Sequence, residues 1–358
     1  MSEAQQGIGH GASACRCLAS CWMPLLVLLA LGHSSLAQAE DLSVFRPAAQ
    51  PATSIRDLFN LVLGITGAIF VLVEGVLIYS AVRFRRRPGS TDPEPAQVYG
   101  SAPLEVAWTV APLLIVFVLF LVVVRSVVEA QDGNDDDDGP VLRVQVIGHQ
   151  WWWEIVYPND DPRAAFGTAN ELHVPARTDG KTTRVELELL SADVIHSFWV
   201  PRLAGKTDLI PGNTNRMWFD SREPETFYGQ CAEFCGTQHA NMKLLVVAEE
   251  QDDFRRWQEN ERKPAVDTDS AGRDRFLALG CVNCHTVRGT TARGTVGPDL
   301  THLMARRTLA AGATQNDHDQ LRAWIAGPDT IKPGSKMPNM HLSGEDVDLI
   351  VGYLESLR

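Results

Sequence analysis

The segment Cys231-Ala232-Glu233-Phe234-Cys235-Gly236-Thr237-Gln238-His239-Ala240-Asn241-Met242 places two thiols, one imidazole and one thioether within twelve residues. A further imidazole lies upstream, in Ala192-Asp193-Val194-Ile195-His196-Ser197-Phe198-Trp199-Val200-Pro201. Soft sulfur ligands combined with imidazoles select copper or zinc. We therefore predict a metal site that takes His196 from one loop and its other ligands from residues 231–242.

Zinc and a disulfide bond are the alternatives to copper at this segment. Two cysteines and two histidines satisfy a tetrahedral zinc site, and Cys231 and Cys235 can form a disulfide in an oxidising compartment. Copper is favoured because methionine is a poor zinc ligand but a usual weak axial ligand of copper. Two cysteines can also bridge two copper ions, which gives each ion two thiolates and one imidazole.

The residues around this segment alternate between apolar and polar side chains. Residues 141–146 and 183–189 have a period of two, and residues 243–247 form a third strand candidate. Short strands separated by Gly/Pro turns indicate a β-sandwich or a Greek-key barrel. We expect residues 131–250 to form a cupredoxin-like β-sandwich that carries the metal site on its loops.

The N-terminal 39 residues have the pattern of a signal peptide. Arg16 precedes a short apolar run at residues 22–31, and Ala37-Gln38-Ala39 is a small-x-small cleavage site. Cleavage there removes Cys15, Cys17 and Cys21, so the remaining cysteines all lie in motifs. Leu18-Ala19-Ser20-Cys21 resembles a lipoprotein cleavage box, but the apolar run follows the cysteine instead of preceding it.

Within residues 40–130, two stretches at about 58–82 and 106–128 are long and apolar enough to span a bilayer. The loop between them carries Arg83, Arg85, Arg86 and Arg87, which by the positive-inside rule faces the cytoplasm. Everything after residue 129 is then outside the cytoplasm. We expect a two-pass protein of the bacterial inner membrane, with residues 131–358 on the periplasmic, outer side.

The formal net charge of the 358-residue chain is −12. This acidic balance argues against nucleic acid as a partner and suits a basic protein partner. The acidic run Asp135–Asp138 is predicted to be a solvated loop, with docking of a basic partner as the alternative.

The C-terminal part contains Gly280-Cys281-Val282-Asn283-Cys284-His285. Cys-x-x-Cys-His is the attachment motif of a c-type haem, with two thioether bonds and an axial histidine. The alternative is a redox Cys-x-x-Cys with an incidental histidine. Met337, in a Gly/Pro loop, is the preferred sixth ligand, with Met340 and Met304 as alternatives. Met/His ligation raises the reduction potential, which suits transfer to a downstream acceptor.

Residues 251–267 are charged and predict a helical linker. Residues 268–358 predict short helices, at about 273–279, 317–326 and 344–357, joined by Gly/Pro-rich loops. This domain resembles small class I cytochromes c, including the segment Gly297-Pro298-Asp299-Leu300. The fold class is therefore mixed: a transmembrane hairpin, a cupredoxin-like sandwich and an all-α cytochrome c domain.

Residues 50–250 resemble subunit II of cytochrome c oxidase, because the copper segment keeps the whole spacing of the family's dinuclear copper (CuA) motif. The resemblance implies that these side chains are copper ligands: His196, Cys231, Cys235, His239 and Met242. It implies that Glu233 gives a backbone carbonyl to one copper, and that its side chain helps to bind a magnesium ion at the contact with subunit I.

Two further segments resemble this family. Gly148-His149-Gln150-Trp151-Trp152-Trp153-Glu154 is similar to the aromatic segment near the copper site, which implies that Trp151 is the exposed ring through which electrons enter. Leu104-Glu105-Val106-Ala107-Trp108-Thr109 resembles the start of the second membrane helix, where the glutamate marks the entrance of a proton path into subunit I. Glu105 can equally be an interfacial anchor, and Glu74 has no assigned role beyond packing against another subunit.

The resemblance implies an electron-input subunit. Electrons pass from soluble cytochrome c or a reductase complex to the haem, then to the copper pair, then to subunit I, where oxygen is reduced to water with proton pumping. Subunit III is a further expected partner. The alternatives are a CuA-containing nitric oxide reductase and a stand-alone membrane-anchored electron carrier. Glu105 and Glu233 favour the oxidase, and the complete copper ligand set disfavours a quinol oxidase.

Overall fold

The computed structural model describes residues 42–85, 89, 96–132, 139–159, 161, 165–178, 181–266 and 270–358. Residues 42–358 form one compact unit. The predicted signal peptide with its three cysteines, the residues Arg86 and Arg87, and the acidic run at 135–138 lie outside the described residues.

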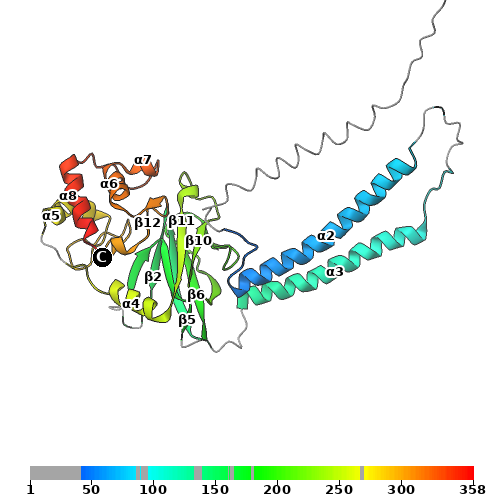
Figure 1. Cartoon of the computed structure of the whole chain (residues 1–358), viewed down its shortest axis with the longest axis horizontal. Coiled ribbons are helices and arrows are strands. Elements are labelled where there is room, and N and C mark those ends of the chain that lie inside the picture. The colour runs from blue at the N-terminus through cyan, green and yellow to red at the C-terminus, as the bar shows by residue number, and fades with distance from the viewer. Residues whose placement is uncertain are drawn as a thin grey trace, which may run out of the picture. The chain divides into compact units, whose positions relative to one another are not determined.

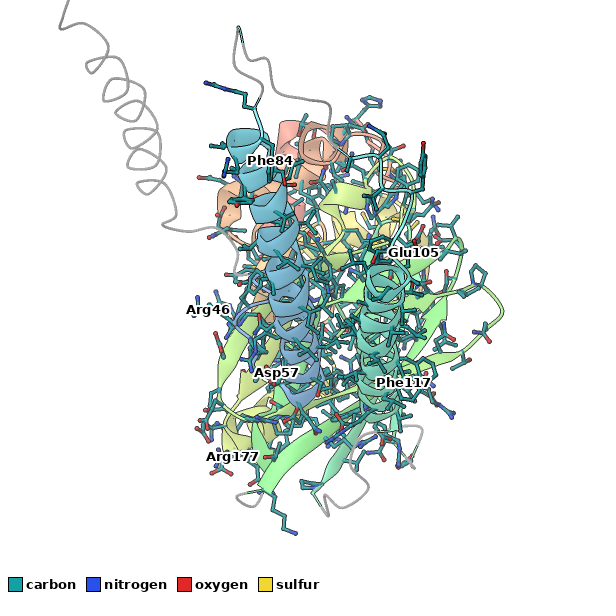
Figure 2. All side chains as sticks on the ribbon, turned by 90° about the vertical axis from the view of Figure 1, so that its right-hand side faces the viewer. Arg46, Asp57, Phe84, Glu105, Phe117 and Arg177 are labelled. Carbon is teal, nitrogen blue, oxygen red and sulfur yellow. The ribbon has the colours of Figure 1, made fainter. Side chains whose placement is uncertain are left out.

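Among the described residues, two helices are long and apolar enough to cross a membrane. They are α2 (Gln50–Arg83) and α3 (Ala102–Asp132), which lie side by side (Figure 1). Their apolar side chains point outward along the pair, as Figure 2 shows for Phe117, which is 57% exposed. Such a surface needs lipid or protein to cover it. Both predicted apolar stretches lie within helices, and both helices extend beyond the apolar runs.

The strands of the sandwich form two sheets (Figure 1). One sheet has the order β3-β2-β1-β6-β5, with β9 also paired to β6. Its strands are β1 (Val141–His149), β2 (Trp152–Tyr157), β3 (Phe166–Ala169), β5 (Arg177–Thr178), β6 (Lys181–Ser191) and β9 (Asn215–Ser221). The other has the order β4-β11-β10-β7-β8. Its strands are β4 (Glu171–Pro175), β7 (His196–Trp199), β8 (Thr207–Leu209), β10 (Glu225–Cys231) and β11 (Lys243–Glu249).

Alternation of side chains builds the core between these sheets. In β1 and β6 every second residue is buried, including Val144, Val146 and Leu187. Trp153 and Phe198 bring aromatic rings from β2 and β7 into the same cluster. Because successive side chains of a strand point to opposite faces, this period of two is what a half-buried sheet requires. The predicted β-sandwich is confirmed, with β1 and β6 paired in parallel.

The predicted linker begins with α4 (Gln251–Glu261), which packs on the sandwich. Phe254 belongs to the core of the sandwich, and Trp257 packs against it. The Trp257 ring stacks on His173 with ring centroids 4.2 Å apart. This helix therefore extends the sandwich domain instead of crossing freely to the next one.

The C-terminal domain is built from short helices, as predicted. Its elements are α5 (Ala271–Ala278), η2 (Cys281–Asn283), η3 (Leu303–Ala305), β12 (Thr308–Leu309), β13 (Thr314–Gln315), α6 (His318–Ala326), α7 (Pro328–Ile331) and α8 (Gly344–Glu355). Side chains of Ser270, Asp317 and Ser343 accept backbone N–H groups at the starts of α5, α6 and α8. Such caps satisfy donors that a helix start leaves unpaired.

Hydrogen bonds join the C-terminal domain to the sandwich. Glu171 in β4 is 1% exposed, and its carboxylate accepts the N–H groups of Arg307 (2.8 Å) and Thr308 (2.9 Å). The N–H of Lys243, at the start of β11, donates to the Ala311 carbonyl at 3.0 Å. The turn around β12 is thus fastened to β4 and β11, which are neighbouring strands of the second sheet.

Candidate metal centre and haem cavity

The side chains of His196, Cys231 and Cys235 meet at one end of the sandwich. His196 begins β7 and Cys231 ends β10, and these two strands are neighbours in the sheet. The two Sγ atoms are 3.8 Å apart, and the ligand atoms of the three residues all lie within 4.8 Å of one another. Both cysteines are free thiols, so the disulfide interpretation does not describe this structure.

The other predicted ligands surround the same sulfur atom. Cys235 Sγ lies 3.7 Å from His239 Nδ1 and 3.9 Å from Met242 Sδ. The 3-10 turn η1 (His239–Asn241) brings these two side chains back toward the cysteines. The backbone carbonyl of Glu233 lies 3.2 Å from Cys231 Sγ, while the Glu233 side chain is exposed. All six predicted positions of the site therefore converge.

One atom of His196 shows that the site fits a metal ion. The ring is fully buried, and its Nε2 bonds to Asp193 Oδ1 at 2.8 Å. A carboxylate only accepts, so Nε2 carries a proton, and in the neutral ring Nδ1 keeps its lone pair. Among the described residues Nδ1 has no hydrogen-bond partner. Carboxylate-bound imidazoles with a free second nitrogen are typical of metal ligands.

The two thiols differ strongly in acidity. The hydrogen bond from Cys235, together with contacts to His196 and two backbone groups, lowers the pKa of Cys231 to about 3. The same hydrogen bond and burial raise the pKa of Cys235 above its usual range. The pair therefore shares one proton, which a metal that binds both thiolates must displace.

Sequence reasoning gave no role to two residues that support the metal site. A Cβ atom on Gly148 would lie 2.7 Å from His196 Cδ2, so the imidazole needs a glycine there. Gln150 Nε2 donates to the Cys235 carbonyl at 2.7 Å. Both residues lie in the quoted aromatic segment, whose proximity to the predicted copper site was the available signal.

Trp151 also donates its indole N–H to the Cys235 carbonyl, at 3.1 Å. The prediction that its ring is exposed is wrong, because the ring is half-buried. It packs against the sandwich core, and the C-terminal domain reaches its backbone through Lys332. The predicted electron-entry residue thus lies directly beside a metal-ligand segment and beneath the second domain.

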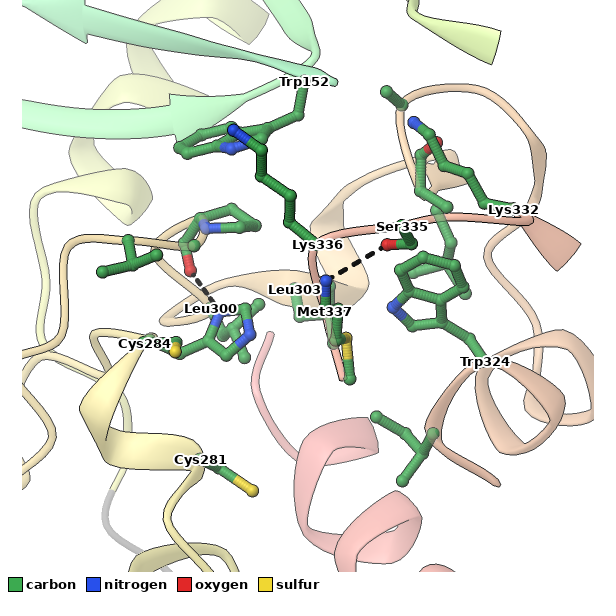
Figure 3. Close-up of a pocket in the computed structure, with 18 of the residues that line it drawn as sticks. Trp152, Cys281, Cys284, Leu300, Leu303, Trp324, Lys332, Ser335, Lys336 and Met337 are labelled. Atoms are coloured by element: carbon green, nitrogen blue, oxygen red, sulfur yellow. Dashed lines mark hydrogen bonds between the residues drawn. The ribbon is translucent and has the colours of Figure 1, made fainter. Parts of the chain in front are cut away.

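A cavity of about 400 Å³ opens between the Cys-x-x-Cys-His motif and the loop that carries Met337. Figure 3 shows Cys281, Cys284 and Met337 around this cavity, with Trp152 of the sandwich on its far side. Both cysteines are free thiols. The largely apolar lining, with two thiols at one wall, fits a flat aromatic group such as a haem.

His285 is oriented as an axial ligand requires. Its Nδ1 lies 2.9 Å from the Pro298 carbonyl, which only accepts, so the other ring nitrogen keeps its lone pair. Burial lowers the pKa of His285, which keeps the ring neutral near pH 7. A Cβ atom on Gly297 would lie 2.6 Å from His285 Cε1, so the glycine of the Gly297-Pro298 segment makes room for the ring.

The three methionine candidates occupy different places. Met337 and Met340 both line the cavity, and Met340 is 47% exposed whereas Met337 is half-buried. Met304 packs against the apolar core of the domain, and its N–H donates to the Leu357 carbonyl. The geometry therefore favours Met337 and leaves Met340 as the second candidate.

Glu105 lies in the first turn of α3 (Figure 2). Its side chain is exposed, and its Oε1 accepts the Ser101 N–H at 3.3 Å. A carboxylate at a helix N-terminus is favourable on electrostatic grounds alone. Glu74 is half-buried within α2.

Family models cover most of the chain. Residues 34–125 match the transmembrane domain of cytochrome c oxidase subunit II, residues 142–249 match its periplasmic domain, and residues 270–358 match cytochrome c. A solved structure of the periplasmic domain of subunit II of cytochrome oxidase from Bradyrhizobium japonicum is 32% identical. It covers 34% of this chain and 93% of that chain, with a TM-score of 0.30.

Two curated relatives match over nearly their whole length. Cytochrome c oxidase subunit 2 of Alkalihalophilus pseudofirmus is 33% identical and covers 95% of this chain and 97% of its own. Cytochrome c oxidase subunit 2 of Bacillus subtilis is 32% identical and covers 93% and 97%. The chain belongs to the cytochrome c oxidase subunit II family, as a two-pass membrane member with an electron-transfer role in a haem-copper oxidase and a C-terminal cytochrome c domain.

Proposed function

We propose that this chain takes electrons from cytochrome c at a covalently attached haem and passes them through a dinuclear copper site to subunit I. When bound, the haem and the copper pair supply one-electron redox chemistry. The convergence of the predicted copper ligands around Cys235 Sγ, beside a cavity walled by Cys281 and Cys284, carries this proposal.

The copper pair would be held by the ligand set predicted from the sequence: the side chains of His196, Cys231, Cys235, His239 and Met242, and the backbone carbonyl of Glu233. The fixed orientation of the His196 ring by Asp193 supports this assignment. The solvent-exposed Glu233 side chain remains available for a magnesium ion shared with subunit I.

The haem would be attached through thioethers to Cys281 and Cys284, with His285 and Met337 as axial ligands. The neutral, oriented imidazole and the open cavity support this assignment. Covalent attachment makes the haem domain a tethered donor, which replaces a diffusional encounter by a high effective concentration.

The membrane part would join this relay to the pumping machinery. Glu105 would mark the entrance of a proton path into subunit I, with subunit III as a further neighbour. Its exposed position at the start of α3 leaves the carboxylate open to a partner. The arginines at the end of α2 and beyond it support a cytoplasmic position for that end of the hairpin, so both soluble domains would face the periplasm of a bacterium.

The test uses the purified intact complex, with metal analysis and oxygen uptake driven by reduced cytochrome c. His239→Ala should leave the haem attached while blocking its oxidation by oxygen, because the copper site lies between the haem and subunit I. Unchanged oxygen turnover in this variant would remove the copper site from the electron path. Absence of copper, or turnover of nitric oxide without turnover of oxygen, would contradict the proposed function as a whole.

A further inference from the structure

Lys332 joins the two loops that carry the predicted sulfur ligands. We define the copper loop as residues 231–242 and the methionine loop as residues 332–338. The ammonium Nζ of Lys332 donates to the carbonyls of Trp151 (2.7 Å), Asn241 (2.7 Å) and Ala310 (2.9 Å). Two of these acceptors belong to the sandwich and one to the C-terminal domain. All three donors of the ammonium are therefore used, across a domain boundary.

Burial makes this arrangement costly unless the bonds are made. Lys332 is 3% exposed, and burial lowers its pKa to about 7. Within the described part of the chain its ammonium has three carbonyl acceptors and no carboxylate partner. A buried ammonium without acceptors is strongly unfavourable. The charged side chain therefore favours only those arrangements in which both domains supply their carbonyls.

A second hydrogen bond joins the copper loop to Pro333, the residue that follows Lys332. Gln238 of the copper loop, 5% exposed, donates from Nε2 to the Pro333 carbonyl at 2.6 Å. Asn241, whose carbonyl binds Lys332, immediately precedes Met242. Lys332 and Pro333 in turn begin the loop that leads to Met337. Lys332 and Gln238 thus join the backbone of the copper loop to that of the methionine loop across the domain boundary.

We propose that Lys332 is a positioning residue that fixes the methionine loop of the C-terminal domain against Trp151 and the copper loop. The domain is then held in one docked arrangement and does not move freely on its linker. The docking stands independently of cofactor chemistry. Its consequence for electron transfer between haem and copper rests on the proposed function.

Amide hydrogen exchange in the purified intact complex tests the docking, with Lys332→Met as the variant. The Lys243 N–H donates across the boundary to the Ala311 carbonyl, so its exchange reports separation of the domains. We expect this amide to exchange at least about tenfold faster in the variant, equivalent to about 1.4 kcal/mol. Amides within α8, in the core of the C-terminal domain, should keep their protection.

Lys336→Met is the matched control. Lys336 lies in the same loop and also reaches the sandwich, with Nζ 3.5 Å from Asp193 Oδ2, but its side chain is 55% exposed. An exposed ion pair contributes little and is screened by salt. We therefore expect this control to change the exchange rate of the Lys243 amide by less than about twofold at physiological ionic strength.

Unchanged exchange at Lys243 in Lys332→Met would overturn the proposal. Faster exchange throughout α8 would overturn it as well, because Lys332 would then stabilise only its own domain. If Lys332→Met does not accumulate, Lys332→Gln, which keeps two donors on a shorter chain, is judged by the same two criteria.

The second readout is the rate of electron transfer from haem to copper after rapid reduction of the haem. In Lys332→Met with full haem and copper content, we expect a rate at least about tenfold lower, because the spacing is no longer fixed. A purely structural role would lower thermal stability without changing this rate in folded molecules. If Lys243 exchanges faster but the rate of electron transfer from haem to copper is unchanged, Lys332 fixes the docking but the docking does not control electron transfer.

Discussion

The imidazole of His196 lies against the backbone of Gly148 so closely that a Cβ atom on Gly148 would be 2.7 Å from His196 Cδ2. Gly148→Ala should therefore displace the ring that the copper site needs. Overpacking of this kind costs ~1–3 kcal/mol, which corresponds to roughly 5- to 150-fold weaker copper binding. Copper content of the purified complex and competition with a copper chelator measure the effect.

Gly167→Ala is the matched control, because Gly167 also lies in a strand of the first sheet. A Cβ atom there would meet only the Ile155 carbonyl, at an ordinary 3.8 Å. Haem content should be unchanged in both variants. Equal copper affinity in the two variants would show that His196 can shift without loss of the site.

Metal binding at the cysteine pair should strengthen as pH rises. The pKa of Cys235 is raised by its hydrogen bond to Cys231 and by burial, so Cys235 keeps its proton at neutral pH. A metal that binds both sulfurs must displace that proton. Lower pH favours the protonated thiol and therefore weakens metal binding. Each displaced proton changes the apparent metal affinity by about tenfold per pH unit.

Titration of metal-free protein with Zn²⁺, which has no redox chemistry, between pH 6 and 8 measures this dependence. The double variant Cys231→Ser/Cys235→Ser identifies binding elsewhere on the chain. A site affinity that stays constant over this pH range would mean that both thiols are already ionised.

Local sequence patterns were sufficient to bring the predicted copper ligands together and to locate three of the strands. Cys231, Cys235, His239 and Met242 lie in one short loop, so their spacing alone brings them together. The period of two identified β1 and β6 because each has one buried face, whereas β11 is a continuous apolar run that is buried on both faces. Hydropathy located the membrane spans but not the helix ends: α2 begins at Gln50, before the apolar run, because a helix can continue through polar residues.

Contacts between segments that are distant in the chain could not be predicted from local sequence patterns. Lys332 binds the carbonyl of Trp151, 181 positions away, and nothing local distinguishes it from a surface lysine. Glu171 likewise has no local sequence feature that predicts its hydrogen bond with the N–H of Thr308 in the other domain. The half-buried state of Trp151 follows from its packing against the sandwich core and its hydrogen bond to the Cys235 carbonyl, which its own segment does not predict.

Gly297→Ala should impair haem attachment. A Cβ atom on Gly297 would lie 2.6 Å from Cε1 of His285, so the ring would have to leave its place opposite the Pro298 carbonyl. The overpacking costs ~1–3 kcal/mol. We expect less haem per purified chain, measured by absorbance, and a lower unfolding temperature of the C-terminal domain.

Gly352→Ala controls for the glycine-to-alanine change itself. Gly352 lies within α8, and a Cβ atom there meets no atom within 4 Å among the described residues. Alanine should stabilise this helix by about 0.5–1 kcal/mol, because glycine loses more backbone freedom on folding. Normal haem content in Gly297→Ala would show that the neighbouring backbone yields and that the ring is held by its hydrogen bond alone.

Met337→Leu tests the sixth haem ligand. Leucine keeps the volume of the side chain but has no sulfur, and Met/His ligation is what raises the reduction potential of such a haem. We expect the potential to fall by on the order of 0.1 V, within the range of ~0.8 V that axial ligands set. Redox titration of the haem in the purified complex measures it.

Met340→Leu and Met304→Leu are the controls. Met340 lines the same cavity but is 47% exposed, and Met304 packs against the core of the domain. Neither change should move the potential. If the reduction potential falls in Met340→Leu and is unchanged in Met337→Leu, the sixth ligand is Met340 and not Met337. Because Lys332 anchors the start of this loop, such a transfer would also require the loop to refold while that anchor stays in place.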